Sequence, residues 1–168
     1  MELSIKTFIL FGAVILTGLS AGLFYAWSVS VIPGTQNVNS SNYLETMQSI
    51  NRAILNPAFF AVFFGSLLFL CIGSIYEIHS DRVTFWLILS SSIVYLTGTV
   101  GVTGLGNVPL NNQLDVLKIV ELSHQKIAEF RTFYETNWNK LHWIRTICAI
   151  TSFMLATASI FTHIKFHK

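Results

Sequence analysis

Charged side chains are scarce in this chain. Only 11% of its 168 residues are Asp, Glu, Lys or Arg, whereas soluble domains carry about 25%. Hydrophobic residues make up 52% of the sequence, and the mean hydropathy is +0.59. This composition excludes an ordinary water-soluble domain and indicates an integral membrane protein in contact with the lipid bilayer. The net charge of +2, spread over scattered basic residues, also excludes an electrostatic surface for nucleic acid.

Motifs of several familiar enzyme classes are missing as well. The sequence has no Gly-x-Gly-x-x-Gly, no P-loop and no His-Glu-x-x-His, which excludes the nucleotide-binding and zinc-protease classes that these motifs mark. The two cysteines, Cys71 and Cys148, belong to no Cys-x-x-Cys or Cys/His pattern, so no metal site is predicted. The sequence therefore predicts no cofactor. A haem held by His124 and His142 is the remaining alternative, because both histidines are expected on one side of the membrane.

Four long apolar runs are present, over residues of about 7–32, 56–78, 83–106 and 141–163. A membrane-spanning helix needs about 20 mainly apolar residues. The first run is longer than the core of a signal peptide and has no Ala-x-Ala cleavage site, so we expect it to be retained. The fourth is uncharged only from Thr146 onward, so its helix must begin near Leu141 and takes His142 and Arg145 into its first turns.

Helix boundary signals support this division. Asn56 followed by Pro57 is typical of a helix start, and Pro109 is expected to end the third span. The short connection at 77–81 predicts that spans two and three are antiparallel neighbours. The sequence thus predicts an all-α fold, an up-down bundle of four transmembrane helices in a single domain over residues 1–168.

Two connections are expected on the side opposite the chain ends. The first includes a short amphipathic helix near residues 43–54. The second, over residues 112–137, lacks Gly and Pro and repeats apolar residues near helical spacing. It predicts an amphipathic helix between spans three and four, lying on the membrane or capping the bundle. Both a plain surface helix and a lid over a pocket fit this pattern.

Basic residues predict the orientation of the chain in the membrane. The terminal side carries Lys6, Arg82, Lys165 and Lys168 in very short segments, and positive charge in short connections favours the cytoplasmic side. Both termini are therefore expected in the cytoplasm. Small residues predict helix contacts: Gly18 and Gly22 favour close packing within the bundle or, alternatively, a homo-oligomer.

A cluster of polar residues is predicted at one membrane depth on the side opposite the termini. Its members are Asn51, Arg52, Asn107, Asn111, Trp138, Asn139, His142 and Arg145. On the fourth span, the spacing of Trp138, Asn139, His142 and Arg145 favours one helical face. Each residue has a plainer interpretation as an interfacial anchor, a helix cap or a cation that reaches the lipid headgroups. Together they predict a pocket for a small aromatic, quinone-like or otherwise lipophilic ligand, because polar groups at membrane depth usually serve function.

Four segments of the sequence carry a family resemblance. They are residues 22–34 (GLFYAWSVSVIPG), 47–57 (MQSINRAILNP), 107–111 (NVPLN) and 138–146 (WNKLHWIRT). In this order they resemble the anthrone oxygenase-like family of integral membrane proteins. Most members of that family have no known function, and its characterised fungal members oxidise anthrones to anthraquinones in polyketide biosynthesis.

The resemblance implies four membrane helices and an oxygenase that acts on an electron-rich aromatic without an obvious cofactor motif. Such chemistry needs a base to form a carbanion that reacts with O2. On that reading His142 is the base, Arg145 or Arg52 stabilises the enolate, and Trp138 stacks on the rings. The amides of Asn51, Asn107, Asn111 and Asn139 complete the binding set. The alternative function is a non-catalytic membrane protein that binds a lipophilic ligand or a partner subunit.

Overall fold

The structure, a computed structural model, describes residues 5–79 and 81–166. Within these ranges the chain is helical and contains no strand, which confirms the all-α prediction. Four helical segments are long and apolar enough to cross a membrane, namely Ile5–Thr35, Pro57–Glu77, Arg82–Asp115 and His124–Thr162. The chain is therefore a multi-pass membrane protein. Lys168, used above to predict orientation, lies outside the described residues.

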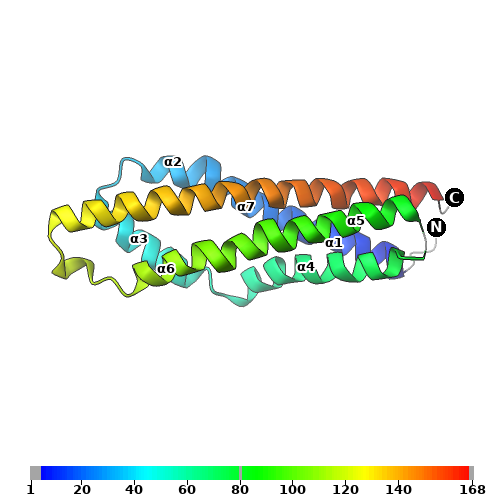
Figure 1. Cartoon of the computed structure of the whole chain (residues 1–168), viewed down its shortest axis with the longest axis horizontal. Helices are drawn as coiled ribbons and strands as arrows, with labels where there is room; N and C mark the ends of the chain where they lie inside the picture. Colours follow the sequence, from blue (N-terminus) through cyan, green and yellow to red (C-terminus); the bar gives the residue numbers. More distant parts are fainter. Residues whose placement is uncertain (1–4, 80, 167–168) are drawn as a thin grey trace.

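The helices follow one another with few connecting residues. In chain order they are α1 (Ile5–Ala26), π-helical η1 (Trp27–Val31), α2 (Ile32–Thr35), α3 (Ser40–Ala53), α4 (Pro57–Glu77), α5 (Arg82–Val94), π-helical η2 (Tyr95–Gly101), π-helical η3 (Thr103–Asn107), α6 (Val108–Asp115), 3-10-helical η4 (Ile119–Glu121) and α7 (His124–Phe166). They form four antiparallel crossings, and the two ends of the chain lie at the same end of the bundle (Figure 1). The up-down topology is confirmed.

The fourth crossing differs from the prediction. Helix α7 is continuous over 43 residues, so residues 124–137 of the segment expected as a separate amphipathic helix join the fourth span without a break. Residues 112–115 of that segment belong instead to α6, and the 3-10 helix η4 lies in the connection between α6 and α7. At 1.5 Å per residue α7 is about 65 Å long, roughly twice the hydrocarbon thickness. The helix can continue because the residues between His124 and Leu141 include no Gly or Pro and bury an apolar face within the protein.

The third crossing also runs further than predicted. Pro109 does not end it, because α6 continues to Asp115. The π-helical turn η3 ends at Asn107, and Pro109 occupies the first turn of α6. A proline is tolerated there because its missing N–H would form no bond within that helix. Pro33 and Pro57 likewise lie in the first turns of α2 and α4.

Helix starts are capped as the sequence indicated. The Asn56 side chain accepts a hydrogen bond from the Phe59 backbone N–H at 3.0 Å, which confirms the predicted start of α4. Asn39 caps α3 in the same way at 2.9 Å. The break between α3 and α4 at residues 54–56 divides the second crossing into two helices that Figure 1 shows end to end.

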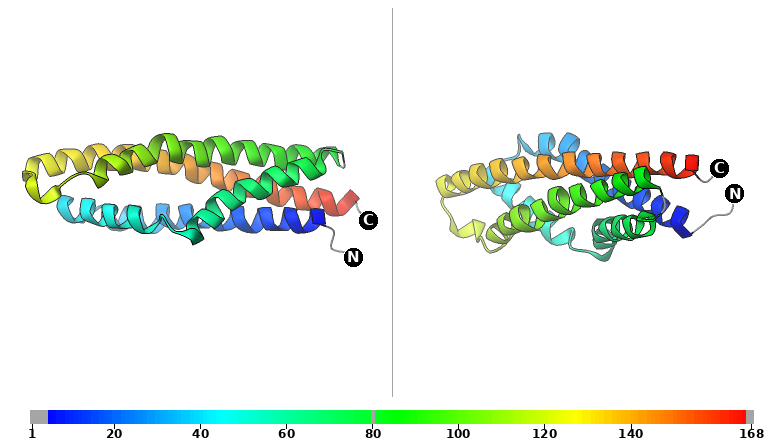
Figure 2. Two further views of the ribbon diagram at one scale, coloured as in Figure 1. Left: turned by 90° about the horizontal axis from the view of Figure 1, so that it is seen from below. Right: turned by 45° about the vertical axis from the view of Figure 1, so that its right-hand side comes forward.

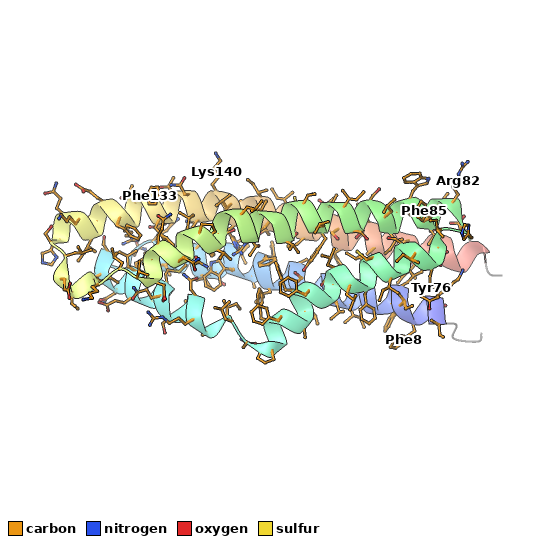
Figure 3. All side chains as sticks on the ribbon, turned by 60° about the horizontal axis from the view of Figure 1, so that its bottom comes forward. Phe8, Tyr76, Arg82, Phe85, Phe133 and Lys140 are labelled. Atoms are coloured by element: carbon orange, nitrogen blue, oxygen red, sulfur yellow. The ribbon has the colours of Figure 1, made fainter. Side chains whose placement is uncertain are left out.

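The break also divides the molecule into a membrane half and a head. We define the head as residues 32–55 and 108–141. Helix α4 has 21 residues and is about 32 Å long, which matches the hydrocarbon thickness. Exposed large apolar side chains such as Phe8, Phe64 and Trp86 cover the membrane half. In Figure 3, Phe8 and Tyr76 point outward near the chain ends, while Lys140 points away from the bundle.

The head has a core of its own. Tyr43, Leu44 and Met47 on α3 pack with buried side chains of α6 and α7, so the apolar face of α3 contacts protein. The Arg131 guanidinium lies 4.6 Å from the Tyr43 ring centre and donates to the backbone carbonyls of Val38, Thr35 and Gln36 at the end of the first crossing. Burial raises the pKa of the Tyr43 phenol, which keeps the ring neutral beneath this cation.

Hydroxyl pairs join the helices in the membrane half. The pairs are Ser20–Tyr95 (2.8 Å), Ser74–Ser92 (3.2 Å), Ser91–Ser152 (2.8 Å) and Thr84–Thr162 (2.8 Å). Every pair includes a residue of the third crossing. Because apolar packing gives little preference for protein over lipid, such bonds contribute to helix association in a bilayer.

The two glycines predicted to mark a contact face are in different surroundings. A Cβ atom at Gly18 would lie 3.0 Å from the Phe153 ring of α7, so Gly18 permits close packing inside the bundle. A Cβ at Gly22 would meet no atom within 4 Å. The predicted homo-oligomer stays a prediction.

Candidate functional site

A cavity of about 340 Å³ lies where the head meets the membrane half. Its aromatic walls are Phe24, Trp27, Phe59, Phe60, Phe63, Phe64 and Trp138. Its polar lining is Asn51, Arg52, Thr103, Asn111, Asn112, Asp115, His142 and Arg145. The volume is at the lower end of the range for small-molecule sites, and mainly apolar walls with a few convergent polar groups are typical of them.

All three π-helical segments contribute to the cavity. Trp27 begins η1, Val100 belongs to η2, and Thr103 and Gly104 belong to η3. A π turn widens a helix and changes which residues face its neighbours, and such turns are frequent at functional sites. The widened turns of the first and third crossings therefore leave space between these crossings and α4.

Arg145 is the central cation of the cavity. Its guanidinium carbon lies 4.7 Å from the Phe24 ring centre and 4.9 Å from that of Trp138, and the residue is 8% exposed. The guanidinium donates to Nδ1 of His142 from Nε at 3.2 Å and from Nη2 at 3.0 Å, and to Oγ1 of Thr103 at 3.4 Å. Across residues 5–79 and 81–166, no carboxylate forms an ion pair with it.

His142 holds Arg145 in place. Because a guanidinium can only donate, Nδ1 of His142 must accept and the ring proton resides on Nε2. That Nε2–H donates to the Phe24 carbonyl at 3.1 Å and lies 3.0 Å from the Ser28 hydroxyl. The ring is fully buried and stacks on Trp138, with centres 5.0 Å apart. Both ring nitrogens therefore already have protein partners.

A hydrogen-bonded chain runs along the head side of the cavity. Asn51 Nδ2 donates to the Tyr134 hydroxyl at 3.1 Å, and that hydroxyl donates to Asn111 Oδ1 at 3.0 Å. Trp138 Nε1 donates to the same oxygen at 2.9 Å. Since Asn111 Oδ1 accepts both bonds, the NH2 group of Asn111 stays available for a ligand oxygen.

An ion pair borders the cavity beside this chain. Arg52 Nε on α3 lies 2.6 Å from Asp115 Oδ1 on α6. The Arg52 and Asp115 side chains are 64% and 49% exposed, so they belong to the water-accessible side of the site. The pair joins the second and third crossings through residues that are 63 positions apart in the sequence.

Six of the eight residues predicted for the site line this cavity: Asn51, Arg52, Asn111, Trp138, His142 and Arg145. Asn107 and Asn139 do not. Asn107 is buried behind the wall, where its Nδ2 donates to the Trp138 carbonyl at 3.3 Å. Asn139 is partly exposed beside the cavity-lining Trp138, because adjacent residues of a helix point about 100° apart.

Several cavity residues were not predicted from the sequence. Among the described residues, Asp115 is the only carboxylate that lines the cavity. In the sequence it resembled any other acidic residue of a polar connection. Four phenylalanines of the cavity wall had a sequence signal: they recur at helical spacing and form an aromatic strip along one side of a helix. They are Phe59, Phe60, Phe63 and Phe64. Phe24 lies within the first segment of the family resemblance, residues 22–34, and Thr103 lies shortly before the third, residues 107–111; neither has any other sequence signal.

Two other arrangements have no support in the geometry. The haem alternative fails because His124 and His142 lie on the same helix, about 27 Å apart along its axis. Ser20 is the centre of Gly18-Leu19-Ser20-Ala21-Gly22, which matches the Gly-x-Ser-x-Gly pattern of hydrolases. It lies in the middle of α1 and hydrogen-bonds to Tyr95, whereas that pattern requires a strand-to-helix turn.

Comparison with known families identifies the chain. The model of the anthrone oxygenase family matches residues 47–155, more than half of the 168 residues. This range includes the cavity residues from Asn51 to Arg145 but not Phe24 or Trp27. No curated protein and no solved structure matches the chain. The chain belongs to the anthrone oxygenase family.

Proposed function

We propose that the cavity binds an anthrone-type aromatic and catalyses its oxidation by O2 to the corresponding quinone. The single observation that carries this proposal is the Arg145 guanidinium, which lies buried between two aromatic rings with no carboxylate partner in the described part of the chain. A buried cation of this kind favours an anionic ligand oxygen. The family match supports the choice of anthrone.

The proposed reaction needs no external reductant. An anthrone loses its methylene proton to water at the open side of the cavity, and the resulting enolate places its negative charge on oxygen. The carbanion carbon donates electrons to O2 and forms a C–O bond, and protonation gives a hydroperoxide. Loss of water then leaves the second carbonyl, so that anthrone and O2 yield anthraquinone and water.

Arg145 contributes by stabilising the enolate oxygen. A preorganised cation in a site of low polarity stabilises developing negative charge much more strongly than water does. His142 acts through Arg145 as a positioning residue, since its Nδ1 accepts two of the guanidinium bonds. Trp138 stacks on the ligand rings, and the Asn111 NH2 group orients the second ligand oxygen.

The test is oxygen consumption by the purified protein in lipid nanodiscs with anthrone. We expect one O2 consumed per anthrone and one labelled oxygen atom in the quinone when ¹⁸O2 is supplied. Arg145→Gln should lower turnover about 10²–10³-fold, the usual effect of removing one oxyanion-stabilising group. Lys140→Gln is the matched control, because this cation of the same helix points away from the bundle (Figure 3) and should leave turnover unchanged.

The same experiment distinguishes the alternative function. Anthraquinone could instead bind and stabilise the protein against heat while no oxygen is consumed. That result would overturn the proposed oxygenase activity and favour a non-catalytic ligand-binding protein. Equal activity of the Arg145→Gln and Lys140→Gln variants would overturn the role of Arg145.

We further propose that both chain ends face the cytoplasm. The two ends lie on one side of the bundle (Figure 1), and the short 77–81 connection carries Arg82 at its border on that side. Positive charge in short connections favours the cytoplasm. The cavity and the head then lie toward the opposite face of the membrane.

A further inference from the structure

We infer that the cavity is filled from the bilayer, through a lateral portal between α4 and the π-helical segment η3. The portal residues are Phe60 and Phe64 on α4, Gly104 on η3 and Val108 on α6, all of which line the cavity. The occupant is an apolar aromatic molecule dissolved in the lipid. Only the identity of that molecule as an anthrone rests on the proposed function.

The exposed surface at the portal consists of apolar side chains. Phe60 is 39% exposed, Phe64 50% and Val108 40%, although each also lines the cavity. The wall of the cavity is therefore continuous with the outer surface of the bundle at this point. None of the portal residues is charged, so the portal offers an apolar ligand no charged side chain.

The depth of the portal places it in hydrocarbon. Helix α4 matches the hydrocarbon thickness and begins at Pro57, so Phe60 and Phe64 lie about 4 and 10 Å inside the boundary. The first half of α4 diverges from the third crossing, whereas its second half lies beside α5 (Figure 2). The ribbons thus separate at the level where the cavity lies.

The polar side of the cavity is restrained. The Arg52–Asp115 ion pair joins α3 to α6 there, and Asn51, Tyr134 and Asn111 are tied by hydrogen bonds. The portal has no such connection. Gly104 contributes no side chain, and a Cβ atom built on it would meet nothing within 4 Å.

Gly104 therefore controls the width of the portal. A Cβ atom at this position meets open space, so a larger side chain can start there without moving the backbone. Gly104→Leu should narrow the portal while the fold is retained. Gly22→Leu is the matched control, since Gly22 is also exposed, also has no atom within 4 Å of a built Cβ, and does not line the cavity.

The experiment uses the tryptophans of the cavity as reporters and needs no substrate. The chain has four tryptophans; Trp86 and Trp143 are exposed, while Trp27 and Trp138 line the cavity. In a Trp86→Phe/Trp143→Phe protein in liposomes, the fluorescence comes from the two tryptophans that line the cavity. This fluorescence is quenched either by a nitroxide-labelled hydrocarbon confined to the bilayer or by iodide in water.

We expect strong quenching by the hydrocarbon and weak quenching by iodide. Gly104→Leu should lower the quenching constant of the hydrocarbon several-fold, and Gly22→Leu should leave it unchanged. Stronger quenching by iodide than by the hydrocarbon would overturn the proposed portal, and so would an equal effect of Gly104→Leu and Gly22→Leu. Because neither anthrone nor oxygen turnover is involved, a protein without oxygenase activity can still show the portal, and an active oxygenase can still lack it.

Discussion

A histidine in contact with a buried arginine can serve catalysis in two ways, as a general base or as a residue that positions the arginine. As a general base, His142 would need a nitrogen free to take a proton from the ligand. In the structure Nδ1 accepts from Arg145 and Nε2–H donates to the Phe24 carbonyl. The arrangement supports a positioning role, in which the imidazole orients the guanidinium.

Two substitutions of His142 separate these roles. Gln offers an amide oxygen to Arg145 and an NH2 group to the Phe24 carbonyl, whereas Leu offers neither. We expect His142→Gln to retain much of the turnover with anthrone and His142→Leu to lose most of it, with the larger change in kcat. A general base would make both variants equally inactive, by about 10²–10⁴-fold.

Asn111 is the residue on which the cavity's hydrogen bonds converge. Its Oδ1 accepts from the Tyr134 hydroxyl and from Trp138 Nε1, and both of these residues are buried. Asn111→Ala leaves two buried donors without an acceptor, and we expect the free energy of unfolding to fall by about 1–3 kcal/mol.

Thermal unfolding in detergent measures this change. Asn137→Ala is the control, because Asn137 is exposed on the same helix as Trp138 and bonds only to the Phe133 carbonyl in the described contacts. Equal stability of the two variants would show that water satisfies the two donors in place of Asn111.

At the scale of elements, close approach of helices fixes the shape of the site. The π-helical segment η2 lies against α7, and a Cβ atom at Gly98 would fall 2.5 Å from Cβ of Cys148. Gly98 is the residue that permits this contact. The segment η2 also carries Val100 of the cavity wall, so its distance from α7 determines the space beside His142 and Arg145.

Gly98→Ala should therefore be strongly destabilising, by about 1–3 kcal/mol, the typical effect of overpacking. The compensating change is Cys148→Gly, which removes the side chain that the new methyl group contacts. We expect the double variant to recover thermal stability relative to Gly98→Ala alone. Gly22→Ala, in open surroundings, should keep or slightly raise stability; no recovery in the double variant would contradict the contact.

At the scale of the whole molecule, the head is expected outside the hydrocarbon and opposite the chain ends. In a Cys71→Ser/Cys148→Ser background, Gln125→Cys reports on the head and Arg82→Cys on the terminal side, since both positions are exposed. A membrane-impermeant maleimide should label Gln125→Cys in intact cells, and Arg82→Cys only after lysis. The reverse pattern would invert the orientation, and labelling of both in intact cells would contradict an odd number of crossings between them.

The sequence alone determined the class of protein and much of its layout. Hydropathy is a local property, so four apolar runs sufficed to predict four crossings and the all-α fold. Caps are local as well, and Asn56-Pro57 was assigned correctly from two adjacent residues. The placement of the polar residues was partly predictable too, because six of the eight proposed site residues line one cavity, while their roles stay predictions.

Only the tertiary structure decided which of these residues face a ligand. The cavity is a volume between four crossings, and it depends on side chains of Phe24, Thr103 and Arg145 that are distant in sequence. Helical spacing places Trp138 and Asn139 about 100° apart, but only the neighbouring helices decide which of the two faces the cavity. His142 also contacts Phe24 of α1 and Ser28 of η1, and no pattern on α7 records these two partners. Packing between distant segments therefore turned a row of polar residues into a cavity with one central cation.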